Sequence, residues 1–171
     1  VILSLHSLAQ LLRKRRFAQG AINFSSQEVQ FVLDAEGRPV DVAARPHGTA
    51  NELIEEFMLL ANKTVAERIG RRRGNAKVKP FVYRVHDEPD MEKLGQLSSF
   101  AATLGYTFKV GASSKAVSKN LNKFLAEVKD KPEGDKFATI AVRTMAKAKY
   151  TTDNIGHYGL AFPYYTHFTS P

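Results

Sequence analysis

Two adjacent glutamates are the most informative candidates for chemistry in this sequence, because they should not share one environment. Residues 51–70 are rich in Leu, Glu, Ala and Met and contain no Pro or Gly before position 70, which predicts a helix. At about 100° per residue, Glu55 falls beside Asn51 and Asn62, and apolar positions flank this polar stripe on both sides. Glu56 falls instead on a charged face, which we expect to be solvated.

The environment predicted for Glu55 leaves two interpretations open. A carboxylate embedded in apolar surface needs hydrogen-bond partners, so we expect Glu55 to have them. The partners could belong to a structural contact with a neighbouring loop or with Arg and Lys, which is the commoner use of a buried polar cluster. Alternatively, Glu55 could be part of a functional site.

Two basic clusters could neutralise the phosphates of a nucleic acid. They comprise Arg13, Lys14, Arg15 and Arg16, and Arg71, Arg72 and Arg73. The sequence has 25 Lys and Arg against 17 Asp and Glu, a formal net charge of +8. This excess favours a polyanionic partner, with nucleic acid ahead of an anionic membrane surface. Each phosphate contact would add salt-dependent affinity, although isolated charge runs are also common on solvated faces and mobile loops.

One aromatic side chain lies where it could contact a nucleic acid base. Phe24 follows the first basic cluster and precedes a predicted hairpin, so that a base could stack on its ring. A phenylalanine in this position could equally belong to the hydrophobic core.

Several kinds of site have no support in the sequence. The absence of Cys removes disulfides, thiolate nucleophiles and Cys-ligated metals, and is compatible with a cytoplasmic protein. The five histidines lack metal-ligand spacing, so we expect no zinc; they are His6, His47, His86, His157 and His167. Neither a glycine-rich phosphate loop nor a Gly-x-Ser-x-Gly elbow is present. The residues alone therefore show no catalytic constellation.

A scaffold of helices and short strands must position these candidates. Apolar periodicity predicts helices over 4–18, 51–70, about 94–104, from a Ser113 or Ser114 cap to before Pro132, and over 136–149. Alternation around the turn 34–37 predicts a β-hairpin that closes at Pro46, and 81–85 reads as a short strand. The expected fold class is α+β, in one domain with mixed helices, a hairpin and short strands.

The two ends of the chain give a further expectation. No stretch approaches the roughly 20 apolar residues of a membrane span, and the start lacks the basic region of a signal peptide, so we expect no membrane partner. The chain lacks an initiator Met and finishes in aromatic and apolar residues, which indicates that both ends are cut. Apolar surface exposed at cut ends could promote self-association.

The C-terminal sequence resembles a known family. Residues 156–171, Gly-His-Tyr-Gly-Leu-Ala-Phe-Pro-Tyr-Tyr-Thr-His-Phe-Thr-Ser-Pro, are similar to the signature of the catalytic RNB domain of the ribonuclease II/R family. Segments 51–62 and 83–89 and the turn 20–24 resemble the same family in the same order. The resemblance covers nearly the whole chain, with ribonuclease R the closer branch. It implies that residues 1–171 are a partial RNB domain, truncated at both ends.

The resemblance implies an activity that this chain would not perform alone. The family hydrolyses single-stranded RNA processively from the 3′ end, in a channel where aspartates hold Mg²⁺. Those aspartates lie upstream of the matched region, and the basic residue that contacts the reacting phosphate follows the signature beyond Pro171. The resemblance therefore implies no catalytic residue and no metal ligand here, single-stranded RNA as the partner, and no required protein partner.

The resemblance also implies roles for individual side chains. Phe24 matches an aromatic residue that stacks on bases near the 3′ end, and Glu55 matches a glutamate that helps to recognise the ribose. The remaining expected RNA contacts are Arg13, Arg15, Arg16, Arg71, Arg72, Tyr165 and His167. A non-catalytic RNA-binding module and a structural fragment of an RNB relative remain as alternatives.

Overall fold

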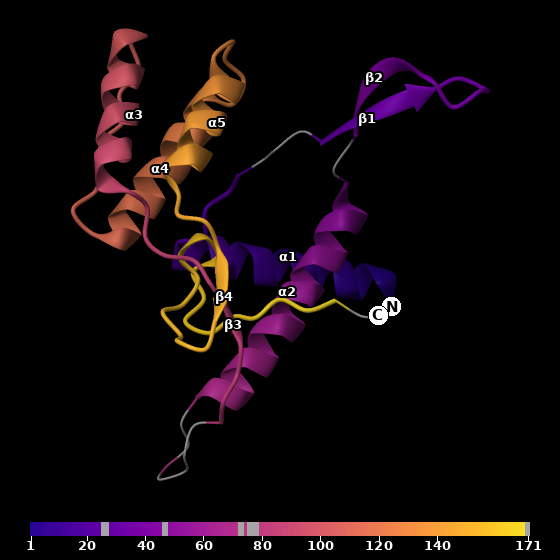
Figure 1. Ribbon diagram of the computed structural model, residues 1–171, viewed down its shortest axis with the longest axis vertical. Helices are drawn as coiled ribbons and strands as arrows, with labels where there is room; N and C mark the ends of the chain where they lie inside the picture. Colours follow the sequence, from indigo (N-terminus) through magenta and orange to yellow (C-terminus); the bar gives the residue numbers. More distant parts are fainter. Residues whose placement is uncertain (25–27, 46–47, 72–73, 75–78, 170–171) are drawn as a thin grey trace.

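Helices and two small antiparallel sheets form the structure, a computed structural model that describes residues 1–24, 28–45, 48–71, 74 and 79–169. Its elements are α1 (Ile2–Gln19), β1 (Glu28–Leu33), β2 (Pro39–Arg45), α2 (Thr49–Gly70), β3 (Tyr83–Val85), α3 (Met91–Thr103), α4 (Ser114–Val128), α5 (Gly134–Thr144), β4 (Lys149–Thr151) and the short 3₁₀ helix η1 (Tyr158–Leu160). Figure 1 shows α3, α4 and α5 grouped at one end, with α1 and α2 crossing below them. The predicted α+β class is confirmed. Among the described residues, no helix has the length and apolarity to cross a membrane.

The main hydrophobic core lies between α3, α4 and α5. Leu94 and Leu97 of α3, Leu121 of α4 and Phe137 of α5 are completely buried in it. The rings of Phe124 and Phe137 meet edge to face with centroids 5.1 Å apart, a favoured arrangement for aromatic pairs. Each helix buries one apolar stripe, as the periodicity predicts.

Capping residues fix the starts of α3 and α4, whereas the end of α5 differs from the prediction. Asp90 accepts hydrogen bonds from the N–H groups of Glu92 and Lys93 at the start of α3. Ser113 accepts a hydrogen bond from the Ala116 N–H, so the predicted cap is confirmed. The helix predicted over 136–149 is wrong at its end, because α5 stops at Thr144 and Met145 is extended. Residues 149–151 pair instead with β3, so long-range pairing overrides the helical propensity of the intervening Ala and Lys.

The predicted hairpin forms, but its apolar side chains are exposed. β1 and β2 pair antiparallel, and the Asp34 carboxylate accepts hydrogen bonds from the N–H groups of Glu36 and Arg38 in the turn. More than half of the surface of Val29 and Phe31 is accessible to solvent. Figure 1 shows the hairpin projecting away from the helices. Pro46, the predicted end of the hairpin, lies outside the described residues.

Where α1 crosses α2, two charged side chains are buried against each other. Arg16 is 5% exposed and Glu56 is 3% exposed, and the Arg16 guanidinium donates two hydrogen bonds to the Glu56 carboxylate. The prediction that Glu56 is solvated is therefore wrong. A helical wheel shows which side chains share a face of α2, but not which face another element will cover. Here α1 covers the charged face and leaves apolar Ile54 and Met58 partly exposed.

A long segment with little regular structure, residues 152–168, is held by backbone hydrogen bonds to β3 and the residue that follows it. The Arg84 N–H donates to the Tyr165 carbonyl at 2.9 Å, and the His86 N–H donates to the Gly156 carbonyl at 3.0 Å. In return, the Tyr158 N–H donates to the His86 carbonyl at 2.8 Å. These bonds satisfy the polar backbone of a segment that has no helix or sheet of its own over most of its length.

Two histidines hold this segment by accepting backbone hydrogen bonds. His86 Nδ1 accepts from the Gly159 N–H at 2.9 Å, while its Nε2 lies 2.8 Å from the Ala146 carbonyl, to which it donates. His157 Nδ1 accepts from the Leu160 N–H at 3.3 Å. Both imidazoles must therefore be neutral, since a protonated ring has no acceptor nitrogen.

Burial keeps both histidines neutral. It lowers the pKa of His157 to about 3, with the neighbouring His86 adding to the effect, and it is also the main reason that the pKa of His86 is lowered. The two rings lie with centroids 5.0 Å apart, so a charge on one would oppose a charge on the other.

The buried ion pair predicts a non-additive mutant cycle. Arg16→Met should lower the free energy of unfolding by about 3 kcal/mol, because Glu56 is left as a buried, poorly paired charge. Adding Glu56→Leu should restore most of that loss, because the buried charge is then gone. Urea denaturation followed by circular dichroism measures the four stabilities. Exposed Arg15→Met is the matched control and should change stability by less than about 0.5 kcal/mol; equal losses for Arg15→Met and Arg16→Met would refute the assignment.

The two neutral histidines predict a loss of stability in acid. In the unfolded chain they bind protons below their usual pKa of 6.5, whereas the folded chain resists protonation. Because of His157, the free energy of unfolding should therefore fall as the pH drops from about 6.5 towards 3, by up to about 1.4 kcal/mol per pH unit, and the lowered pKa of His86 acts in the same direction. Urea titrations at several pH values measure this slope. His157→Asn keeps an acceptor for Leu160 and should flatten the slope; an unaltered slope in His157→Asn would contradict the assignment.

Candidate nucleic-acid interface

The C-terminal segment lies against the polar stripe of α2. Asn62 is 2% exposed, and its amide Nδ2 lies 3.5 Å from His167 Nδ1. The Tyr165 hydroxyl lies 3.1 Å from the same nitrogen. In Figure 1 the segment crosses α2 near the middle of the helix. The structure thus brings Asn62 of the predicted polar stripe together with the predicted site residues Tyr165 and His167, about a hundred residues later in the chain.

Tyr165 is a neutral hydrogen-bonding group in this cluster. Burial raises the pKa of its hydroxyl and outweighs the opposing hydrogen bond with Asn62, while the Glu55 carboxylate acts in the same direction as burial. The hydroxyl can then donate to His167 Nδ1. The Tyr150 hydroxyl donates to the His167 carbonyl at 3.1 Å, which anchors the same residue from its other side.

Glu55 lies at the edge of this cluster and remains accessible. Its side chain is 43% exposed, and one carboxylate oxygen lies 3.8 Å from Arg16 Nη2. The expectation that Glu55 is embedded in apolar surface is therefore wrong, because the neighbouring apolar residues of α2 are themselves partly exposed. Asn51, the third predicted member of the stripe, instead accepts a hydrogen bond from the Gly48 N–H at the start of α2.

The groups gathered here suit recognition of a sugar. A carboxylate accepts hydrogen bonds from hydroxyl groups, and an imidazole or a phenol can either donate or accept them. The 2′-hydroxyl of RNA is both donor and acceptor and is the group that distinguishes ribose from deoxyribose. Glu55 and His167 therefore form a candidate ribose-binding edge. Tyr165 is only 3% exposed, so the prediction that it contacts RNA directly is wrong, and its hydroxyl positions His167 instead.

Phe24 lies at the edge of the main core. Its ring is partly buried and packs against the core cluster between α3, α4 and α5. The preceding turn is held on α4 by Asn122, which accepts from the Asn23 N–H at 2.9 Å and donates to the Ala21 carbonyl at 2.8 Å. The side chain of Phe24 is therefore partly packed and partly accessible, so core packing and base stacking are compatible.

The predicted basic contacts separate into two groups. Arg13 lies 3.2 Å from Glu52, and Arg16 is bound to Glu56, so both guanidinium groups have structural partners. Arg15 and Arg71 are exposed. Arg72 and most of the basic loop after Arg71 lie outside the described residues. The sequence did not show which of these arginines would be paired and which exposed, because the carboxylates that bind Arg13 and Arg16 come from another helix.

Two lysines on α4 were not among the site residues predicted from the sequence. Lys115 and Lys119 are exposed and stand one helical turn apart beside a pocket. Their spacing of four residues on an amphipathic helix could have indicated a paired positive charge. The pocket could not be predicted in the same way, because its second wall comes from α1. Among the described residues, nowhere do three His, Cys, Asp or Glu side chains gather as metal ligands would.

Comparisons with known proteins place this geometry in a family. The RNB domain model matches residues 1–171. The chain is 45% identical over 165 residues to ribonuclease R of Thermotoga maritima, covering 96% of this chain and 22% of that protein. It is 35% identical over 167 residues to ribonuclease R of Escherichia coli, covering 98% of this chain and 20% of that protein. The chain thus spans about a fifth of the length of these relatives.

Solved structures agree with the sequence matches. The apo form of Mycoplasma genitalium RNase R superposes with a TM-score of 0.85 at 30% identity, covering 99% of this chain and 26% of that one. The same enzyme in complex with ribose methylated single-stranded RNA gives the same TM-score, identity and coverage. Yeast Ssd1, described as a pseudonuclease, shares the fold alone, with a TM-score of 0.61 at 21% identity over 97% of this chain and 20% of that one. With an RNB match along its whole length and the ribonuclease R fold, the chain belongs to the RNB domain family.

Proposed function

We propose that this chain is part of a ribonuclease R-like exoribonuclease that hydrolyses single-stranded RNA in the 3′-to-5′ direction, and that it supplies surface that holds the RNA. The observation that carries the proposal is the RNB match over residues 1–171, together with the similarity to an RNase R structure bound to single-stranded RNA. The accessible Glu55 and the neighbouring His167, which Tyr165 positions, support it, because a carboxylate and an imidazole suit a ribose.

Each predicted contact then has a physical role. Phe24 stacks on a base with its accessible side, which adds affinity without reading sequence. Glu55 accepts a hydrogen bond from a ribose hydroxyl, beside Tyr165 and His167. Exposed Arg15 and Arg71 contact phosphates. Arg13 and Arg16 contribute indirectly, because their guanidinium groups bind carboxylates of α2 and hold that helix against α1.

The groups that cut RNA belong, in this proposal, to other parts of a longer protein. Phosphodiester hydrolysis of this kind uses divalent metals such as Mg²⁺ to activate water and stabilise the leaving oxygen. The described residues do not form an acidic cluster that would hold such an ion. In this proposal the metal ligands belong to residues outside this chain, and the enzyme acts in the cytoplasm.

A non-catalytic RNA-binding module is the second candidate, because a pseudonuclease shares this fold. The two candidates differ in the sequence that flanks this segment. An exoribonuclease requires an aspartate cluster before it and a basic pair directly after Pro171, whereas a binding module requires neither. Reading the coding sequence on both sides distinguishes them.

The first prediction from this function is that the chain alone does not degrade RNA. Purified chain incubated with 5′-labelled poly(A) and Mg²⁺ should leave the substrate at its original length on a denaturing gel, because a two-metal site without its ligands cannot activate water. A buffer-only sample gives the background, and a longer RNB protein gives a positive control. Mg²⁺-dependent shortening of poly(A) that co-purifies with the chain would refute the claim.

The second prediction concerns discrimination between RNA and DNA. Glu55→Gln should weaken binding of a short oligo(A) by about tenfold, because a charge-assisted hydrogen bond to the ribose becomes a neutral one. Binding of the matching oligo(dA) should change little, since deoxyribose lacks the 2′-hydroxyl. Fluorescence anisotropy of labelled strands measures both affinities. Glu67→Gln makes the same change of charge elsewhere on α2 and serves as the control; equal losses for RNA and DNA would rule out ribose recognition by Glu55.

A further inference from the structure

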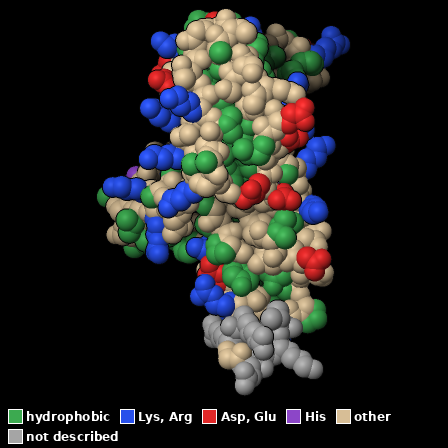
Figure 2. Space-filling model, turned by 90° about the vertical axis from the view of Figure 1, so that its left-hand side faces the viewer, with side chains coloured by type: hydrophobic (Ala, Val, Ile, Leu, Met, Phe, Trp, Pro, Cys, Tyr) green, Lys and Arg blue, Asp and Glu red, His purple; other side chains and the backbone are tan. Residues whose placement is uncertain are grey.

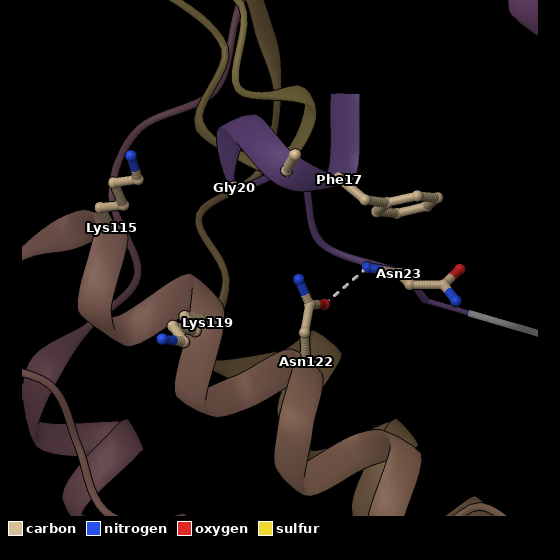
Figure 3. A pocket seen from close by; sticks show the side chains of 7 residues that line it. Phe17, Gly20, Asn23, Lys115, Lys119 and Asn122 are labelled. Carbon is tan, nitrogen blue, oxygen red and sulfur yellow. Dashed lines mark hydrogen bonds between the residues drawn. The ribbon is translucent and has the colours of Figure 1, made fainter. Parts of the chain in front are cut away.

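A pocket of about 550 Å³ lies between the end of α1 and the first half of α4. Its lining includes Phe17, Gly20, Asn23, Lys115, Lys119 and Asn122. Figure 3 shows the two lysine side chains on one side of the pocket, the Phe17 ring and Asn23 on the other, and Asn122 between them. The volume falls within the range of about 300–1,000 Å³ that is typical of ligand pockets.

The charge in this pocket is available to a ligand. Lys115 and Lys119 are exposed and stand four residues apart on α4, so their ammonium groups project from the same face. Within the part of the chain that the structure describes, neither lysine forms an ion pair. They differ in this from Arg13 and Arg16, which form ion pairs with carboxylates of α2.

The remaining walls of the pocket are rigid. The Asn122 side chain is held in place by its hydrogen bonds to the backbone of Asn23 and Ala21. The Phe17 ring lies 5.0 Å from the Arg13 guanidinium and 4.7 Å from that of Arg16, a cation–π arrangement that keeps the ring in position. A pocket whose walls are fixed before binding loses little conformational entropy when a ligand enters.

The position of the pocket suggests a strand as its ligand. Asn23, which lines it, directly precedes Phe24, the predicted base-stacking residue. Two positive charges one helical turn apart, about 6 Å along the helix axis, lie close to the spacing of neighbouring phosphates on one strand. Figure 2 shows Lys and Arg side chains along the left-hand edge of one face of the molecule. The formal net charge of +8 favours a polyanion over a single small anion.

We propose that Lys115 and Lys119 bind successive backbone phosphates of a single RNA strand that passes along this pocket towards Phe24. The inference rests on the proposed function as an RNA-binding part of an exoribonuclease, and it names contacts in addition to those at Glu55 and Phe24. The Phe17 ring forms the apolar wall of the path, while the lysines supply affinity that does not depend on base sequence.

The test measures the salt dependence of RNA binding by the 171-residue chain. A labelled 20-nucleotide single strand is titrated at several salt concentrations with the native chain and with the double variant Lys115→Gln and Lys119→Gln. The control double variant, Lys129→Gln and Lys136→Gln, removes the same charge from exposed lysines, and Lys129 lies about 21 Å along α4 from Lys115. Circular dichroism confirms that all three chains are folded.

The double variant Lys115→Gln and Lys119→Gln should lose two phosphate contacts. The plot of log affinity against log salt should then become less steep by about 1.4, and the affinity at low salt should fall by about tenfold. The control variant should retain the native slope. Equal changes in both double variants would overturn the proposal, because the effect would then follow net charge alone. Competition by adenosine monophosphate would also overturn it, if that nucleotide displaced the labelled strand as effectively, per phosphate, as an unlabelled strand does. The pocket would then bind a free nucleotide rather than a strand. No binding by the native chain would instead refute the proposed function itself.

Discussion

The Arg16 guanidinium and the Glu56 carboxylate are buried together where α1 crosses α2, and much of the candidate interface depends on that contact. Transferring either charge from water without the other would cost several kcal/mol, so the two helices must cross where both groups meet. Successive residues of a helix differ by about 100° in direction. With Glu56 directed at α1, the adjacent Glu55 lies at the rim, half exposed and 3.8 Å from Arg16. The accessible carboxylate is therefore a consequence of the buried one.

The C-terminal segment completes the interface although it has little regular structure. Its conformation depends on hydrogen bonds from β3 and on two neutral histidines that accept backbone N–H groups. These contacts bring Tyr165 and His167 against the polar stripe of α2. Because protonation would remove the acceptor nitrogens, the same arrangement links the position of the site residues to pH. Burial of the two rings thus serves both stability and placement.

Membership of the RNB family and the geometry of this chain together support a role in holding RNA. The groups proposed to contact RNA come from α1, α2, α4 and the C-terminal segment, so no single element forms the surface. Carboxylates within the described residues are used in ion pairs and caps, as at Glu52, Glu56 and Asp90, rather than gathered for a metal. In the proposed function the chain contributes hydrogen bonding, stacking and positive charge, the interactions by which proteins hold a single strand.

The sequence by itself determined the family, the positions of most helices and the hairpin. Residues 156–171 carry a specific signature, and apolar periodicity, the Ser113 cap and the turn at Asp34 are local features that the chain order expresses directly. Only the tertiary structure decided that Glu56 is buried and Glu55 accessible, that α5 ends at Thr144, and that Lys115 and Lys119 face a pocket walled by α1. The physical reason is the same in each case. Periodicity shows which side chains share a face, whereas burial and ion pairing depend on which distant segment packs against that face.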